Sequence, residues 1–114
     1  METRTMTIAE TILSQLGGNK FLAMTGAKNL IDTGDGLRMT LPRNMSKANR
    51  LEITLDYSAD AYNMRFYRYS PAHADHRRMT WVDEKVTEVK AFNGVYFDML
   101  QELFTEVTGF DTHL

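Results

Sequence analysis

The chain has 114 residues, a length typical of one domain, and we expect residues 1–114 to share a single hydrophobic core. It contains no cysteine, which excludes disulfide bonds, thiolate zinc sites and a cysteine nucleophile. Its first residues hold no long apolar run, so we expect neither a signal peptide nor a membrane anchor and interpret the chain as a cytoplasmic protein.

Charge is distributed unevenly along the chain. The net charge is −2, which by itself argues against a strongly basic nucleic-acid-binding protein. Residues 37–78, however, carry eight basic and four acidic side chains, whereas residues 79–114 carry two basic and seven acidic ones. This asymmetry predicts a molecule with a basic side and an acidic side, each of which is either a partner surface or a solvated face.

The first predicted element is a helix over residues 8–16. Thr7 and Glu10 have the spacing of a capping box, in which each side chain satisfies a free backbone N–H group of the first turn. Ile12 and Leu16 recur on one face at helical spacing. The two glycines that follow are typical of a helix end.

The next segment is short and rich in glycine. Residues 21–25 (FLAMT) form an apolar run that predicts a strand or the approach to one. The glycine-containing segments at residues 17–20 and 25–29 lack the spacing of a phosphate-binding loop. We therefore interpret them as turns.

The clearest pattern lies in residues 37–68. Apolar and polar residues alternate with a period of two in three runs, at residues 37–41, 50–56 and 62–69. Successive side chains of a strand point to opposite faces, so these runs predict three strands with one face built for a core. The short turn at residues 58–61 makes the second and third strands antiparallel neighbours.

The last part of the chain begins with a polar segment at residues 70–82. Pro71 ends the preceding strand, so we expect this segment to be an exposed excursion. A last strand is predicted at residues 84–90. From Tyr96 the chain shows its strongest helical pattern, with apolar residues on one side and acidic residues on the other, and Gly109 ends it.

These elements predict an α+β fold in the order helix, four or five strands, helix. The sheet is an antiparallel meander with one apolar face, and both amphipathic helices need that face. Both helices are therefore expected on the same side of the sheet. The other face is then left to solvent or to a partner.

The exposed sheet face and the loop beside it are the main candidate site. The face is expected to carry Arg38, Thr40, Glu52, Thr54, Asn63, Arg65 and Tyr67. The connection at residues 42–50 adds three cations, which are Arg43, Lys47 and Arg50. Open sheets bind single strands when bases stack on aromatic rings and cations follow the phosphates. Arg38, Arg43, Lys47, Arg50, Arg65 and Tyr67 are accordingly the predicted nucleic-acid-binding residues.

An ordinary structural role for the same arginines stays open. Glu52 and Asp56 are expected on the same face, and pairs of opposite charge across neighbouring strands commonly stabilise sheets. The question that separates the two interpretations is whether carboxylates already occupy the arginines.

Catalysis and metal binding have weaker support in the sequence. His73, Asp75 and His76 supply two imidazoles and one carboxylate close together, but no further cluster completes a metal site, and a solvated loop is the better interpretation. No arrangement of nucleophile, base and acid is recognisable. We expect a protein that is not an enzyme and that needs no cofactor.

A protein partner is the alternative to nucleic acid. Trp81 lies in the polar excursion, where it is either an interface residue or folds back and is buried. The acidic final helix could imitate the charge of a nucleic acid. A homodimer formed through an edge strand of the sheet is also open.

Three stretches carry a resemblance to a known family: QLGGNKFLAMTGAKNL (residues 15–30), RLEITLD (50–56) and LQELFTEVTG (100–109). The chain resembles a family of small, functionally uncharacterised proteins of bacteriophages, prophages and related mobile elements. The resemblance spans residues 7–114 except the excursion. It implies expression in a bacterial cytoplasm and a role as a nucleic-acid accessory factor or as an inhibitor of host replication or defence. It assigns no role to any residue.

Overall fold

The computed structural model describes residues 7–110, so both ends of the expected domain, at residues 1–6 and 111–114, lie outside the described residues. The helices are α1 (Ile8–Leu16), α2 (Gly18–Thr25), the 3-10 turn η1 (Phe97–Met99) and α3 (Leu100–Thr108). The strands are β1 (Lys28–Asp32), β2 (Gly36–Thr40), β3 (Arg50–Asp56), β4 (Ala61–Ser70), β5 (His73–Asp75), β6 (Thr80–Val82) and β7 (Lys85–Val95).

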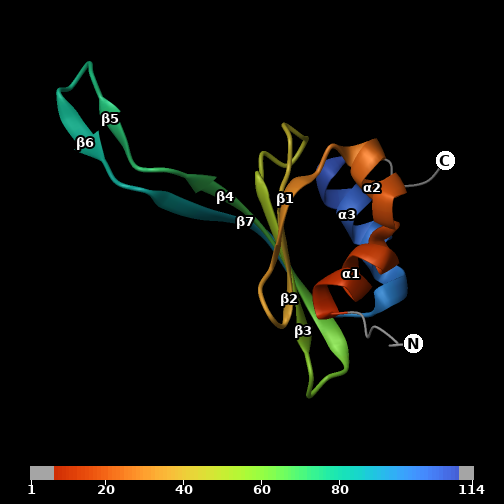
Figure 1. Ribbon diagram of the computed structural model, residues 1–114. Helices are drawn as coiled ribbons and strands as arrows, with labels where there is room; N and C mark the ends of the chain where they lie inside the picture. The colour runs from red at the N-terminus through yellow and green to blue at the C-terminus, as the bar shows by residue number, and fades with distance from the viewer. Residues whose placement is uncertain (1–6, 111–114) are drawn as a thin grey trace, which may run out of the picture.

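The expected α+β fold is confirmed. Five antiparallel strands form one sheet in the order β1-β2-β3-β4-β7, and the N-terminal and C-terminal helices lie together on one of its faces (Figure 1). Each connection in the run from β1 to β4 joins neighbouring strands, as in a meander. Among residues 7–110, no helix lies on the opposite face.

The start of the chain holds two helices rather than one. Helix α1 begins as predicted, because the Thr7 hydroxyl accepts the N–H of Glu10 at 3.1 Å. It ends at Gly17, whose φ of 125° few other residues adopt. Residues 21–25 were predicted to be a strand or the approach to one; they are not a strand but most of α2, which is followed by β1 from Lys28. The buried residues of α2, Phe21 and Thr25, are four apart, which is the spacing of a helix face.

The core lies between the helices and the inward side chains of β2, β3 and β4. The largest fully buried apolar residues are Ile12, Leu16, Phe21, Met39, Leu51, Ile53, Met64, Phe66, Leu100 and Phe104. Phe104 of α3 stands at the centre, with its ring centroid 4.9 Å from that of Phe21 and 6.3 Å from that of Phe66. The period-two pattern thus identified the inward face of the meander correctly.

The sheet has two strands that differ from prediction. Strand β1 was not foreseen, and it pairs with β2 through an irregular register that includes Ile31 opposite Arg38. The last strand, predicted at residues 84–90, runs over Lys85–Val95, and two bulges interrupt its pairing with β4. The C-terminal helical segment starts as the turn η1 and becomes α3 at Leu100; Gly109 ends α3 at a φ of 80°.

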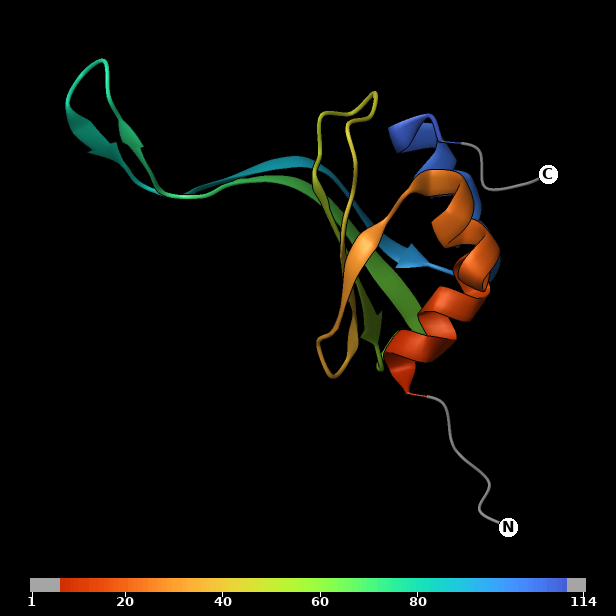
Figure 2. The same cartoon turned by 45° about the horizontal axis from the view of Figure 1, so that its top comes forward.

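The most prominent feature is an arm formed by the outer parts of β4 and β7 together with β5 and β6. Both views show it leaving the body on the side away from the helices (Figures 1 and 2). The molecule therefore measures 59 × 31 × 29 Å. The excursion at residues 70–82 is exposed as expected, but it is a regular hairpin in which β5 pairs with β6.

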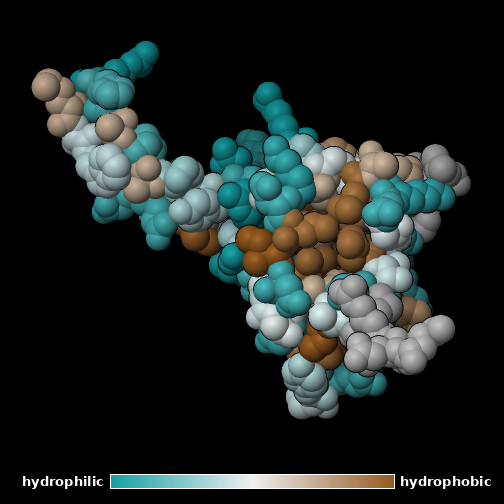
Figure 3. Space-filling view, viewed as in Figure 1, coloured by the Kyte–Doolittle hydropathy of each residue, from teal (hydrophilic) through white to brown (hydrophobic). Residues whose placement is uncertain are grey.

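Apolar surface is concentrated on the body. Figure 3 shows a brown area over β1 and the adjoining helices, whereas the arm is mainly hydrophilic to neutral. A hollow of about 290 Å³ between α1 and β1 lies there, lined by residues that include Leu13, Leu30 and Leu37. Strand β1 is the sheet edge at this point, and all five of its residues are exposed.

Candidate functional site

The open face of the sheet carries the residues that the alternation of β2, β3 and β4 placed there. Arg38, Glu52 and Arg65 lie side by side on neighbouring strands, because they are register partners. The next row holds Thr40, Arg50, Tyr67 and Glu88. Four of the six predicted binding residues, Arg38, Arg50, Arg65 and Tyr67, thus share this face.

Arg65 is already occupied by a carboxylate. Its Nε donates to both carboxylate oxygens of Glu88, at 2.9 and 2.8 Å, and its guanidinium carbon lies 4.4 Å from the centre of the Tyr67 ring. Tyr67 is buried, with 7% of its surface exposed. A base therefore has no free ring face on which to stack here, and both residues serve mainly to hold the sheet face together.

Arg38 and Arg50 are differently placed. They line a hollow of about 370 Å³ on the open face together with Asn29, Ile31, Thr40, Tyr67 and Tyr69. No carboxylate is among the lining residues. Arg50 lies 5.4 Å from the centre of the Tyr69 ring and donates from Nη1 to its neighbour's carbonyl, the Asn49 oxygen, at 3.0 Å. Within residues 7–110 the only ion pair recorded joins Arg65 and Glu88, so neither Arg38 nor Arg50 is in one.

Glu52 and Asp56 were expected to pair with the arginines of this face, but within residues 7–110 neither forms an ion pair. Glu52 is the register neighbour of Arg38 and of Arg65 but forms an ion pair with neither. Asp56 caps the next turn, where its Oδ1 accepts the hydroxyl of Ser58 at 2.7 Å and two backbone N–H groups. The hydrogen bond from the Ser58 hydroxyl holds the pKa of Asp56 below its usual value.

The basic loop between β2 and β3 has a defined conformation. The Asn44 side chain bridges it by donating to the carbonyls of Pro42 and Ala48, at 2.8 and 2.7 Å. The N–H of Met45 donates to the Thr108 carbonyl at 3.2 Å, which ties the loop to the end of α3. The loop is thus fixed at both its base and its tip.

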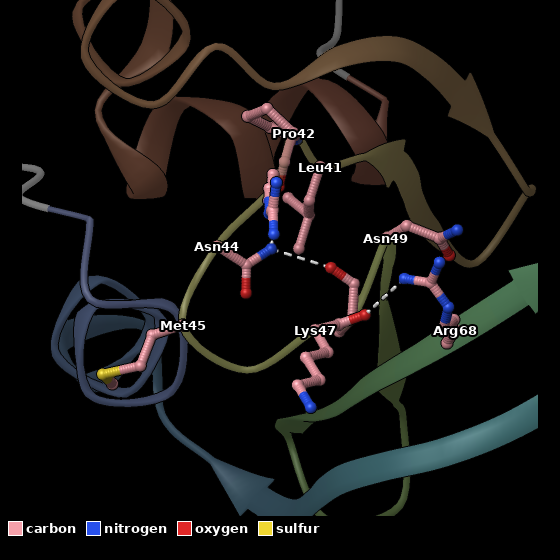
Figure 4. Close-up of a pocket in the computed structure, with 9 residues that line it drawn as sticks. Leu41, Pro42, Asn44, Met45, Lys47, Asn49 and Arg68 are labelled. Carbon is pink, nitrogen blue, oxygen red and sulfur yellow. Dashed lines mark hydrogen bonds between the residues drawn. The ribbon is translucent and has the colours of Figure 1, made fainter.

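This loop and β4 enclose a second hollow of about 630 Å³ (Figure 4). Its lining includes the cations Arg43, Lys47 and Arg68 and again no carboxylate. Arg68 reaches from β4 toward the loop and donates from Nη1 to the Lys47 carbonyl at 3.0 Å, so its position is set by the backbone. Asn49 joins the same strand by exchanging two hydrogen bonds with the backbone of Tyr69.

The structure separates the predicted cations into two groups. Along β4, Phe66 and Arg68 point to the face that carries the helices, whereas Tyr67 and Tyr69 point to the open face. Arg43 and Lys47 accordingly accompany Arg68, while Arg38 and Arg50 stand on the other side of the sheet. The two hollows lie on opposite sides of the same end of the sheet, where consecutive residues of β4, Arg68 and Tyr69, line one each.

Arg68 was missing from the predicted site. A signal was present in the sequence, since Arg68 continues the inward series of Tyr62, Met64 and Phe66. A cation at a core-facing position indicates that the strand runs past its core. Glu88 was also missed, because its position opposite Tyr67 depends on bulges in β7 that no local pattern reveals.

Two tyrosines have shifted acidities without forming a catalytic group. The Tyr69 hydroxyl donates to Glu84 at 2.8 Å, and this hydrogen bond, reinforced by the negative charge of Glu84, raises the pKa of Tyr69. Burial raises the pKa of Tyr62. Both shifts favour the neutral phenol and give no activated nucleophile.

The segment that contains His73 and His76 lies in the arm, where β5 leads into a turn. Asp75 accepts the backbone N–H groups of Arg77 and Arg78, at 3.1 and 3.3 Å, and His73 contacts the Pro71 carbonyl through Nδ1. In the part of the chain that the structure describes, no three His, Asp or Glu residues are grouped so that they could hold a metal ion.

Comparisons of the chain with models of protein families, with curated proteins and with solved structures found no match. Among residues 7–110, no helix is both long enough and apolar enough to cross a membrane.

Proposed function

We propose that this protein is a non-enzymatic accessory protein of a bacteriophage or another mobile element, and that it binds nucleic acid. The observation that carries the proposal is the pair of hollows on the two sides of one end of the sheet. Five cations line them, Arg38 and Arg50 in one and Arg43, Lys47 and Arg68 in the other, and neither lining includes a carboxylate.

The placement of these cations suits a phosphate backbone. They surround one end of the sheet from both sides, and no ion pair neutralises them within residues 7–110. Two of them are held by backbone carbonyls, which reduces the side-chain freedom that binding would remove. The mode differs from the one expected from the sequence, because the buried Tyr67 offers no stacking platform and the phosphate contacts supply the affinity.

A salt titration tests the proposal. Binding of fluorescently labelled single-stranded and duplex DNA is measured by anisotropy at several salt concentrations. Each phosphate contact on duplex DNA contributes about 0.9 to the slope of log affinity against log salt, so five contacts predict a slope of about −4 to −5. The variant Arg43→Ala/Lys47→Ala should lose about two units of slope, and Arg38→Ala/Arg50→Ala the same.

A charge-matched control separates the site from general electrostatics. Lys20→Ala/Lys90→Ala also removes two positive charges, but Lys20 is exposed on α2 and Lys90 lies on β7, and neither lines either hollow. This variant should bind almost as the unmodified protein does. Absence of binding at low ionic strength, or equal losses in the control and the site variants, would overturn the proposal.

A protein-binding function is the second candidate, and one observation favours it. Tyr96, Phe97 and Met99 are 59%, 62% and 38% exposed at the start of the acidic C-terminal helical segment. Exposed aromatic residues are enriched at protein interfaces, and a patch of them would suit an inhibitor of a host replication or defence protein. A stoichiometric partner retained from nuclease-treated bacterial lysate, and lost with Tyr96→Ala/Phe97→Ala but not with Arg43→Ala/Lys47→Ala, would support this function.

A further inference from the structure

The arm takes no part in the hydrophobic core, which includes none of residues 70–86. Beyond Tyr67, the last residue of β4 that pairs with β3, the sheet narrows to two strands, and the residues of β5 and β6 are exposed apart from the half-buried Asp75. An isolated two-stranded ribbon is marginally stable in water. The ribbon nevertheless extends far from the body. With it the molecule is 59 Å long, although its other two dimensions are about 30 Å.

The tip of the arm is cationic. Arg77 and Arg78 occupy the turn between β5 and β6 and are exposed. Asp75 is the acidic residue nearest to them in sequence, and its carboxylate accepts their backbone N–H groups while the guanidinium groups make no ion pair recorded within residues 7–110. Farther from the tip, the exposed Asp83 carries a negative charge just after β6, and Glu84 accepts the hydrogen bond of Tyr69 at the root of the arm. The arm thus presents its free positive charge at the far end.

Large apolar side chains accompany the tip cations. Met79 is 91% exposed and Trp81 is 64% exposed, in a segment with no core to cover them. Met79 has a φ of 51°, a left-handed conformation uncommon for a residue other than glycine, which turns the chain sharply at this point. Arginines beside exposed apolar side chains can contact both the hydrogen-bonding edges and the thymine methyl groups of bases.

The dimensions of the arm fit one kind of nucleic acid. A two-stranded ribbon enters the major groove of B-form DNA, which is roughly 12 Å wide and 8.5 Å deep. The six residues from Ser70 to Asp75 extend the arm by about 20 Å, enough to carry the tip from the body into the groove. The major groove of A-form RNA is too narrow for such an element.

We infer that the arm enters the major groove of duplex DNA, where Arg77 and Arg78 contact base edges or flanking phosphates, while the cations at the root of the arm hold the backbone. This inference rests on the proposed nucleic-acid binding and narrows it to duplex DNA. Arg38 and Arg50 are suitably placed for the second part, because they share a hollow with Tyr67 and Tyr69 of β4, the strand that continues into the arm.

The chain supplies its own reporter for this contact. Trp81 is the single tryptophan of the sequence and lies within the arm, so tryptophan emission reports on the arm alone. Titration with an unlabelled duplex should change this emission, and the change should saturate at the same DNA concentration as the anisotropy of a labelled duplex. Duplex RNA of the same sequence should bind at least about tenfold more weakly.

Two further experiments locate the contact, one on the protein and one on the DNA. Arg77→Ala/Arg78→Ala should weaken duplex binding by about tenfold or more and lower the salt slope by up to about two units, as measured against Lys20→Ala/Lys90→Ala. A duplex whose major groove is filled by glucosylated hydroxymethylcytosine should bind about as weakly as that variant. In the tip variant and on the filled duplex alike, Arg43→Ala/Lys47→Ala should still lower the salt slope by about two units.

The outcomes distinguish a failure of the inference about the arm from a failure of the proposed function. If the protein binds duplex DNA through the hollows but Trp81 emission, the tip variant and the filled groove all have no effect, the inference about the arm is wrong and the proposed function stands. The arm would then be free for a protein partner. If no DNA binds at low salt, both are wrong.

Discussion

The body and the arm share two strands but are stabilised in different ways. In the first part of β4, from Ala61 to Tyr67, most side chains are buried beneath the helices or within the open face, whereas Arg68 is exposed. In β7 only Val95 is buried. The strands thus have a core on one side in the body, whereas the arm has only cross-strand pairs and turn hydrogen bonds. A strand pattern in the sequence identifies a strand and does not by itself identify a core.

The largest expected effect contrasts an aromatic residue from each region. Phe104→Ala should lower the free energy of unfolding by about 3–5 kcal/mol, because Phe104 is fully buried between Phe21 and Phe66 and its loss leaves a cavity. Trp81→Ala should change it by no more than about 0.5 kcal/mol, since the indole is exposed. Urea denaturation measures both, and a similar loss for the two variants would show that the arm folds onto a core after all.

A smaller effect is expected at the junction of the two regions. Glu88→Gln removes the carboxylate that holds Arg65, a partly exposed pair whose contribution to stability is about 1 kcal/mol or less. The freed guanidinium adds a cation to the open face, where Glu52 of β3 stands between it and Arg38. Duplex DNA affinity should therefore rise, and its salt slope should steepen by about one unit. Unchanged affinity would mean that the open face does not contact DNA.

The parts of the fold that could be predicted from the sequence are those whose signal lies within a few consecutive residues. The inward faces of β2, β3 and β4 and the Thr7 cap of α1 were predictable, because period-two alternation and a capping box are contained in a few residues. Helix α2 was not, since a five-residue apolar run such as 21–25 suits a strand as well as a buried helix.

The candidate site depended more strongly on tertiary structure. The sequence placed Arg38 and Arg50 among the candidates, and the structure leaves both without a carboxylate partner in the residues it describes. The sequence could not show that Glu88 pairs with Arg65, because the two residues are 23 positions apart and a bulge between Phe66 and Tyr67 shifts the register. Strand β1 was missed for the same reason: its position comes from pairing with β2 and not from a pattern of its own.

The smallest expected effect is a pH dependence at the root of the arm. Hydrogen bonding to Glu84 raises the pKa of Tyr69 above its ordinary value of about 10, so the folded state favours the neutral phenol. The resulting stabilisation is present below pH 10 and is lost as the pH rises through the raised pKa. Glu84→Gln removes the charge and should return this phenol to a lower pKa.

Ultraviolet titration of the tyrosines measures this shift. One phenol should titrate at lower pH in Glu84→Gln than in the unmodified protein, and adding Tyr69→Phe should abolish the difference between the two curves. Identical curves for the unmodified protein and Glu84→Gln would show that the hydrogen bond does not persist in solution, and that the root of the arm is less fixed than the body.

The most direct test of the central claim is the slope of log affinity against log salt for a labelled DNA duplex. It is measured for the unmodified protein, for Arg43→Ala/Lys47→Ala and for the charge-matched Lys20→Ala/Lys90→Ala. The five cations of the hollows predict a slope of about −4 to −5, steeper by up to about two units where both arm arginines contact phosphates, and this slope should fall in magnitude by about two units in the first variant and stay nearly unchanged in the second. No binding, or the same slope in all three proteins, would contradict the assignment of the two hollows to nucleic acid.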